Sequence, residues 1–244
     1  MSLNVLILAA GGGQNDNSTH DYPDCLTESD GVLLIERIVE TLRNLDGAQY
    51  YCVILEEDAR RFRIDEVLKQ LITNVSVIKV PQGTKGSACT ALLAAAQMQS
   101  KLPLLIVSSN ELVKLDQRDV IKDFVSRKLD AGTLTFRALH PRYSYVRTNG
   151  QGFIEEASQH RPISQQATAG VFWFAQTFDF VEAAKNLIRK DASDSGGFFI
   201  APTFNELILK QLKVGIYPIP KGAYVPLKND HQRKRYEEGG NEAS

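Results

Sequence analysis

The first half of the chain alternates between short apolar runs and amphipathic stretches. Each apolar run stops at a glycine or a polar turn, which is typical of parallel strands buried on both faces. We expect such strands at Leu3–Ala9, Tyr51–Leu55, Val75–Val80 and Leu104–Ser108. Apolar residues at helical spacing predict helices between them, at Val32–Leu45, Asp65–Ile72, Ser87–Gln99 and Gln117–Leu129. This order predicts an α/β fold with a mainly parallel sheet, flanking helices and right-handed crossovers.

The second half has a different pattern. Asn149-Gly150 lies between two short alternating runs, which indicates a β-hairpin. Further strands are expected at Thr133–Leu139, Ala169–Phe174 and Lys213–Pro218, and helices at Phe178–Arg189 and Pro202–Lys210. No repeat or linker separates the two parts. We therefore predict one domain over residues 1–236, with an open-sheet half (1–130) and a β-rich half (131–236), followed by a disordered polar tail over 237–244.

Composition and charge exclude several classes of protein. With 244 residues, 43% of them hydrophobic, the chain can bury a sizeable core. Its formal net charge of −1 provides no basic field for nucleic acid or an anionic membrane surface. The three cysteines have no metal-ligand or redox spacing. We expect a cytoplasmic protein with neither nucleic acid nor membrane as a partner.

The pattern also predicts where a ligand binds. In open α/β sheets, ligands lie beyond the carboxyl ends of the strands. The loops Ala10–Asp16, Pro81–Gly86 and Ser108–Glu111 should therefore meet at one edge. Gly11, Gly12 and Gly13 would let the backbone approach a ligand and would offer N–H groups to an anion. The loop has neither the GxGxxG spacing nor the lysine of a Walker loop.

This glycine loop carries only negative charge. No lysine or arginine occurs before Arg37, whereas acidic residues occur at Asp16, Asp21, Asp24, Glu28 and Asp30. Unpaired carboxylates in a cleft would repel one another and any bound phosphate. We therefore expect the polar segment 14–29 to be mobile or turned outward, with Asp24 pointing away from the cleft.

The order of motifs resembles a known family. "VLILAAGGGQ" followed by "YPDCLTESDGVLLIERIVETL" is similar to the N-terminal signature of sugar-phosphate nucleotidyltransferases. "PQGTKGSACTALLAA" resembles their base-contacting Gly-Thr-Ala loop, and "PLLIVSSNELVKLD" resembles the strand that ends at a magnesium-binding Asp. "SYVRTNGQGFIEEASQHRPIS", "ATAGVFWF" and "FFIAPTFNELIL" follow in the family's order. The resemblance spans nearly the whole chain and is closest to glucose-1-phosphate thymidylyltransferase-like proteins of polysaccharide biosynthesis.

The resemblance implies a fold, a reaction and a set of positions. The fold is the Rossmann-like one shared with GT-A glycosyltransferases, with a nucleotide-binding half and a sugar-binding half. The substrates are a nucleoside triphosphate and a sugar 1-phosphate, which give a nucleotide sugar and pyrophosphate with Mg²⁺ as cofactor. The implied nucleotide-binding positions are Ala10, Gly11, Gly12, Gly13, Gln82, Gly83 and Thr84. The implied sugar-binding positions are Arg147, Thr168 and Gly170. A homo-oligomer is compatible with the resemblance, which does not specify one.

At the family's charged catalytic positions that can be placed on this sequence, the residue here is a different one. The loop arginine falls on Asn15, the Pro-Lys lysine on Asp24 and the Glu-Lys lysine near Gln159. The magnesium Asp falls on Asn110, so that Asn110 and Glu111 are the remaining candidate oxygen ligands. A unit charge about 4 Å from another is worth roughly 4 kcal/mol at an effective dielectric near 20. Replacing a lysine by an aspartate therefore removes several tenfold factors of binding or rate.

Three functions remain open at this point. The first is an active or weakly active nucleotidyltransferase, in which Lys85, Arg147 or Lys228 supplies the missing positive charge. The second is a non-catalytic homologue that binds a nucleotide or a sugar, or that serves as a scaffold for a partner enzyme. The third is a GT-A-type glycosyltransferase, which ranks last because "SSNE" lacks a metal-binding Asp-x-Asp. The four histidines are scattered and have no metal-ligand spacing.

Overall fold

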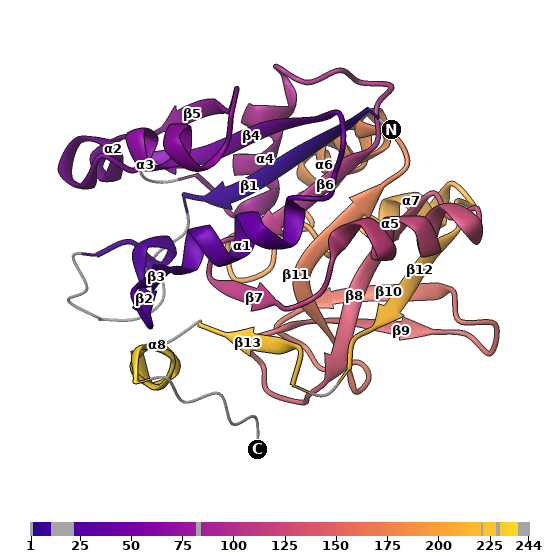
Figure 1. The fold of residues 1–244 in the computed structure, drawn as a ribbon. Helices are drawn as coiled ribbons and strands as arrows, with labels where there is room; N and C mark the ends of the chain where they lie inside the picture. Colours follow the sequence, from indigo (N-terminus) through magenta and orange to yellow (C-terminus); the bar gives the residue numbers. More distant parts are fainter. Residues whose placement is uncertain (1, 11–21, 82–83, 221, 228–229, 239–244) are drawn as a thin grey trace.

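A computed structural model describes residues 2–10, 22–81, 84–220, 222–227 and 230–238 (Figure 1). Among these residues, nine strands form one sheet. Its main path has the order β10-β9-β11-β6-β1-β4-β5, and β8 pairs with both β11 and β12. The strands are β1 (Leu3–Ala9), β4 (Ala48–Leu55), β5 (Ser76–Val80), β6 (Leu104–Ser108), β8 (Ala131–Arg137), β9 (Ser144–Thr148), β10 (Ile154–Gln159), β11 (Gln166–Phe174) and β12 (Val214–Pro218).

The strand directions confirm the predicted mixed, mainly parallel sheet. Strands β6, β1, β4 and β5 run parallel to one another. Strand β11 then runs antiparallel to β6, which reverses the direction at the start of the β-rich half. The predicted hairpin is present as β9 and β10. Its turn is closed by Asn149, whose Oδ1 accepts hydrogen bonds from the backbone N–H groups of Gln151 and Phe153.

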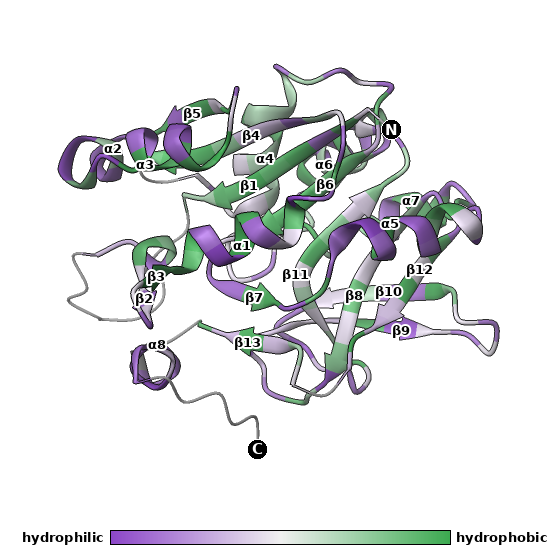
Figure 2. Cartoon of the chain, in the orientation of Figure 1, coloured by the Kyte–Doolittle hydropathy of each residue, from purple (hydrophilic) through white to green (hydrophobic). Residues whose placement is uncertain are grey.

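Helices cover both faces of the sheet. One face packs against α1 (Leu34–Leu42), α3 (Ile64–Leu71) and α5 (Gln117–Ser126), and the other against α4 (Ser87–Ala95), α6 (Thr177–Arg189) and α7 (Thr203–Leu209). All seven residues of β1 are buried, as expected for a central parallel strand. Figure 2 shows this strand as an almost continuous apolar band.

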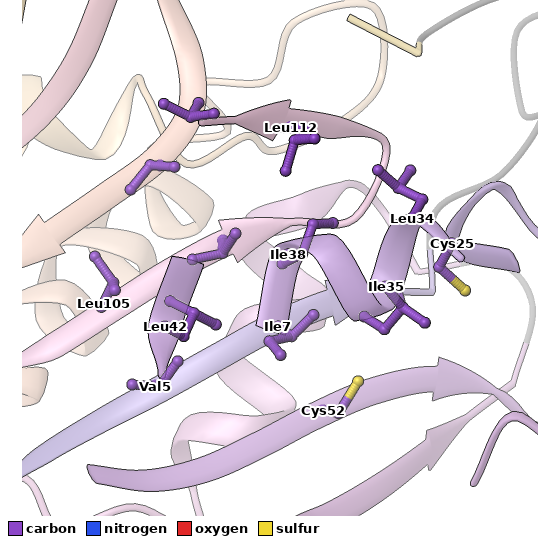
Figure 3. Packing of buried hydrophobic residues seen from close by; sticks show 14 of the residues in the cluster. Val5, Ile7, Cys25, Leu34, Ile35, Ile38, Leu42, Cys52, Leu105 and Leu112 are labelled. Carbon is purple, nitrogen blue, oxygen red and sulfur yellow. The ribbon is translucent and has the colours of Figure 1, made fainter. Parts of the chain in front are cut away.

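The side chains of β1 alternate between the two cores. Val5 and Ile7 belong to the α1 core, where Figure 3 shows them beside Ile38 and Leu42. Leu6 and Leu8 belong to the core on the α4 side. Burying one such aliphatic side chain is worth about 1.5–3 kcal/mol. This central strand therefore fixes the position of Ala10, which directly follows it.

Several elements were not predicted. Two are short strands, β7 (Glu111–Val113) and β13 (Tyr224–Pro226), which pair antiparallel. The others are a two-stranded ribbon, β2 (Glu28–Ser29) with β3 (Val32–Leu33), and the helices α2 (Glu56–Phe62) and α8 (Asp230–Glu237). Strands of two or three residues are too short to show an alternating pattern. Within the described ranges, no helix is both long enough and apolar enough to cross a membrane.

Candidate functional site

Three strand ends define one edge of the sheet. The parallel register aligns Leu8 with Ser108, Ala9 with Ile54 and Leu55 with Val80. The chain therefore leaves β1, β5 and β6 on the same side, as predicted. The backbone N–H of Ser109 donates to the carbonyl of Leu8 at 3.1 Å, which ties the loop after β6 to the end of β1.

Several predicted nucleotide-binding positions lie outside the described residues. They are Gly11, Gly12, Gly13, Gln82 and Gly83, together with the altered catalytic position Asn15. Ala10 is described and directly follows β1. These positions stay predictions.

The segment before α4 is held by a distant part of the chain. Phe198 donates its N–H to the carbonyl of Lys85 at 2.7 Å and accepts from Ala88 N–H at 3.0 Å. Gly86 has a φ of +94°, and a Cβ there would lie 2.4 Å from the Phe198 carbonyl oxygen. The hydroxyls of Thr84 and Thr90 are 2.8 Å apart and hydrogen bonded. These contacts fix the Thr84–Gly86 backbone at the edge of the sheet.

Glu111 is held in place by its neighbours in the fold. Its side chain is buried, and its Oε2 accepts a hydrogen bond from the Tyr224 hydroxyl at 2.6 Å. Gly170 has a φ of +66°, and a Cβ there would lie 2.1 Å from Glu111 Oε1. Burial and the adjacent Glu111 carboxylate raise the pKa of Tyr224 well above its usual value. Asn110 accepts a backbone hydrogen bond from Leu227 N–H at 3.1 Å, which continues the β7–β13 pairing.

These contacts do not fit the predicted metal site. A Mg²⁺ ligand must present an open oxygen, and the Glu111 carboxylate is engaged by Tyr224 and packed against Gly170. Asn110 contributes only a neutral amide. Within the described ranges, no group of three or more His, Cys, Asp or Glu side chains could hold a metal ion.

The expectation that segment 14–29 is mobile or turned outward is wrong for Asp24, and residues 14–21 lie outside the described residues. Asp24 begins a short 3₁₀ helix, η1 (Asp24–Leu26), in which Cys25 and Leu26 are buried in the α1 core. Its Oδ1 accepts a hydrogen bond from Arg233 Nη1 of α8 at 2.8 Å. The Asp24 side chain is 11% exposed and that of Arg233 is 14% exposed. Residues 23–27 are thus held against the core, because apolar neighbours anchor them and Arg233 balances the carboxylate charge.

The predicted catalytic and sugar-binding positions of the β-rich half lie on three neighbouring strands. Gln159 ends β10, is buried and accepts a hydrogen bond from the Ser144 hydroxyl. Arg147 on β9 forms an ion pair with Glu156 at 2.7 Å. Thr168 on β11 is buried, and Gly170 contacts Glu111 as described above.

A cavity of about 630 Å³ lies beside Arg147. Its lining includes Thr148 on β9, Arg137 on β8 and Gln166 on β11. Thr168 and Gly170 are not part of the lining. Of the three predicted sugar-binding positions, only Arg147 lines this cavity.

Sequence reasoning missed the residues that complete this region. Arg233 reaches Asp24 from 209 residues away, and Tyr224 reaches Glu111 from 113 residues away. Both come from the C-terminal segment, where α8 lies beside β2 and β13 lies beside β7 (Figure 1). No local pattern marks these partners, because each contact depends on the folding of the whole sheet.

Comparisons with known proteins support the fold. No protein-family model and no curated protein matches the sequence. Among solved structures, the nucleoside-diphosphate-sugar pyrophosphorylase of Vibrio cholerae RC9 is similar, with a TM-score of 0.78 and 16% identity over 97% of this chain and 100% of that chain. A UDP-glucose pyrophosphorylase complexed with UDP-glucose has a TM-score of 0.76 and 16% identity, covering 98% of both chains.

A third similar structure is the inositol-1-phosphate CTP transferase of T. maritima. It has a TM-score of 0.72 and 16% identity over 98% of this chain and 95% of that chain. The chain therefore has the Rossmann-like fold of sugar-phosphate nucleotidyltransferases, which confirms the resemblance at the level of fold. The closer resemblance to thymidylyltransferase-like proteins stays a prediction.

Proposed function

We propose that this protein binds a nucleoside triphosphate and a sugar phosphate at the carboxyl edge of its sheet. We further propose that it joins them into a nucleotide sugar slowly or not at all. In such a reaction, an oxygen of the sugar phosphate attacks the α-phosphorus of the triphosphate and pyrophosphate leaves. The chemistry depends on positioning and on positive charge near the phosphates.

The Asp24–Arg233 ion pair carries this proposal. Asp24 occupies the position at which the resemblance implies a lysine. Arg233 balances its negative charge at 2.8 Å, so Asp24 does not repel a bound phosphate as a bare carboxylate would. The guanidinium is nonetheless committed to Asp24 and does not replace a free lysine. The arrangement tolerates a polyanion, yet it stabilises the transition state less than a lysine would.

The metal positions support the same conclusion. Mg²⁺ in nucleotide sites is held by one or two carboxylates together with the substrate phosphates. The Glu111 carboxylate is engaged by Tyr224, and Asn110 is uncharged. We expect any dependence on Mg²⁺ to come from metal that arrives bound to the triphosphate.

Lys85 is the best placed remaining cation. Arg147 is paired with Glu156, which also accepts from Arg161, and Lys228 lies outside the described residues. Lys85 makes no ion pair with any residue that the structure describes, and its backbone is fixed beside the edge by Phe198. Its ammonium group is therefore available to a phosphate.

The experiment measures binding and turnover separately. Calorimetric titration with each common nucleoside triphosphate, with and without Mg²⁺, should detect binding to the wild type. The Lys85→Ala variant should bind about tenfold more weakly, as expected for the loss of one charged contact. Lys101→Ala is the matched control, because Lys101 is exposed and precedes β6 at the opposite edge of the sheet.

Turnover is measured by pyrophosphate release over a panel of hexose 1-phosphates. We expect a rate below about 1 s⁻¹, the lower end of the ordinary enzyme range. A faster rate would overturn the proposed impairment while leaving the substrate class intact. Absence of binding to every triphosphate would refute the proposed site. Sugar transfer from a ready-made nucleotide sugar would instead identify a glycosyltransferase.

A further inference from the structure

A histidine–aspartate pair lies beside the candidate site. The Nδ1 atom of His160 is 2.8 Å from Asp194 Oδ1, and both side chains are about one-third exposed. His160 directly follows Gln159 at the end of β10, and its N–H donates to the carbonyl of Tyr143 at 3.1 Å. No sequence pattern singles out this histidine, because Asp194 is 34 residues away.

Asp194 is held by a tight turn. Asp194 and Gly197 exchange two backbone hydrogen bonds of 2.9 Å, and both residues between them, Ser195 and Gly196, have positive φ angles. This is the geometry of a two-residue type I′ turn, which is rigid. Ser195 Oγ donates to Asp194 Oδ1 at 3.1 Å. The carboxylate is therefore preorganised before any ligand arrives.

The same turn connects the two halves of the candidate site. Phe198, just after the turn, holds the Lys85–Ala88 backbone through two hydrogen bonds. Asp194, at the start of the turn, holds His160 at the end of β10. The short segment 194–198 thus contacts both His160, through Asp194, and the backbone of Lys85, through Phe198.

The hydrogen-bond pattern restricts what His160 can do. An ionised carboxylate only accepts, so Nδ1 is the donor to Asp194. Nε2 makes no hydrogen bond with any described residue. Ser195 donates to the aspartate and not to the imidazole, so the cluster is not an activated serine nucleophile. An oriented imidazole with an unpaired Nε2 can donate to a phosphate oxygen when it is protonated.

His160 also has a strained backbone. Its φ is +59°, in the left-handed region that residues with a side chain seldom adopt. Ser195 has a φ of +49° in the contacting turn. A positive φ is thus found on both sides of the His160–Asp194 contact.

We propose that His160, oriented by Asp194, binds the phosphate group of the sugar phosphate. The inference rests on the proposed function and names the group that recognises its second substrate. His160 Nε2 would donate to the phosphate, and Lys85 would face the triphosphate. The imidazole would thereby provide positive charge next to Gln159, where a lysine is absent.

The test compares affinities for a panel of hexose 1-phosphates and for the same free hexoses by calorimetry. The principal variant is His160→Asn, since asparagine tolerates positive φ and can still donate to Asp194. We expect it to weaken hexose 1-phosphate binding by about 10- to 100-fold. Binding of the triphosphate should not change. His140→Asn is the control, because His140 is an exposed histidine whose ring contacts Arg142.

A second readout reports on the imidazole itself. The chain has four histidines, so the ring proton signals of His160 can be assigned by their loss in His160→Asn. Addition of hexose 1-phosphate should shift these signals in the wild type, and free hexose should not. His160→Lys keeps a cation and should retain more affinity than His160→Asn.

The outcomes separate the two proposals. Unchanged affinity in His160→Asn, or an unshifted His160 signal on saturation, would overturn the role of His160 and leave the proposed function standing. Triphosphate binding without binding of any hexose 1-phosphate would overturn this inference together with the sugar-phosphate part of the proposed function. If the wild type binds neither class of ligand, both proposals fail.

Discussion

Arg233 Nη1 donates to Asp24 Oδ1 at 2.8 Å and thereby joins the last helix of the chain to the loop that follows its first strand. Both side chains are largely removed from solvent. Breaking such a pair leaves a poorly solvated charge without its partner, which costs more than the pair itself contributes. The contact therefore makes the fold of the η1 segment dependent on α8.

A charge-reversal cycle measures this dependence. Asp24→Lys places a lysine against Arg233, and Arg233→Glu places a second carboxylate against Asp24. Each change should lower the free energy of unfolding by about 2 kcal/mol or more. The double variant should recover at least about 1 kcal/mol, because opposite charges meet again. Urea unfolding gives the coupling energy.

The exposed pair Asp119–Lys122 provides the control for the cycle. Its side chains are 67% and 61% exposed. Reversing both charges there should give a coupling of no more than about 0.5 kcal/mol. Equal coupling at the two sites would contradict the structural role of Arg233. A test of the proposed impairment through Asp24→Lys and Asn110→Asp must accordingly change Arg233 as well.

Gly170→Ala tests the contact with Glu111. The new Cβ would lie 2.1 Å from Glu111 Oε1, at a φ of +66°. We expect a loss of about 2–4 kcal/mol from backbone strain and overpacking together. Gly152→Ala is the matched control, because Gly152 has a φ of +81° and open space around its Cβ position. It should lose only about 1–2 kcal/mol by thermal unfolding, and an equal loss would show that Glu111 moves aside freely.

Tyr224→Phe removes the hydrogen bond to Glu111. The buried carboxylate would lose a donor at 2.6 Å, and we expect a cost of about 1–3 kcal/mol. Tyr217→Phe is the comparison, since the hydroxyl of Tyr217 makes no hydrogen bond within the described ranges. Chemical denaturation of the two variants should show a clear difference. A Tyr224→Phe variant as stable as the wild type would mean that Glu111 is satisfied without this tyrosine.

Alkaline pH should destabilise the fold through its buried thiols. Burial, reinforced by the charge of Asp58, raises the pKa of Cys25 from 9.0 to about 12. Between these values the folded state keeps a proton that the unfolded state has lost. The contribution of Cys25 is complete below pH 9 and is lost as the pH rises toward 12, by about 1.4 kcal/mol per pH unit.

Cys25→Ala should make this decline shallower. The measurement is the difference in free energy of unfolding between pH 7 and pH 10.5, so that the constant cost of the cavity cancels. Burial also raises the pKa values of Cys52 and Tyr224, so part of the decline should persist in the variant. An identical difference in wild type and variant would show that Cys25 does not titrate as the structure implies.

The sequence determined the parts of the fold that depend on local pattern. The unbroken apolar run of Leu3–Ala9 specifies a central strand, because each of its side chains needs a core on one face or the other. Asn149 specifies the hairpin turn, and Asp116 caps α5 by accepting from Arg118 N–H. The predicted ligand-binding edge follows from the shared direction of the parallel strands.

Only the tertiary structure decided how the site charges are balanced. The residues near Asp24 in the sequence include no cation to balance its carboxylate, and the fold brings Arg233 to it. From the sequence, Glu111 is a candidate metal ligand, whereas in the structure its carboxylate accepts a hydrogen bond from Tyr224. His160 has no partner in its local sequence, whereas in the structure Asp194 orients it. These contacts span 34 to 209 residues of sequence. Their partners are brought together by packing of the sheet and not by spacing, since electrostatic pairing depends on distance in space and has no sequence period.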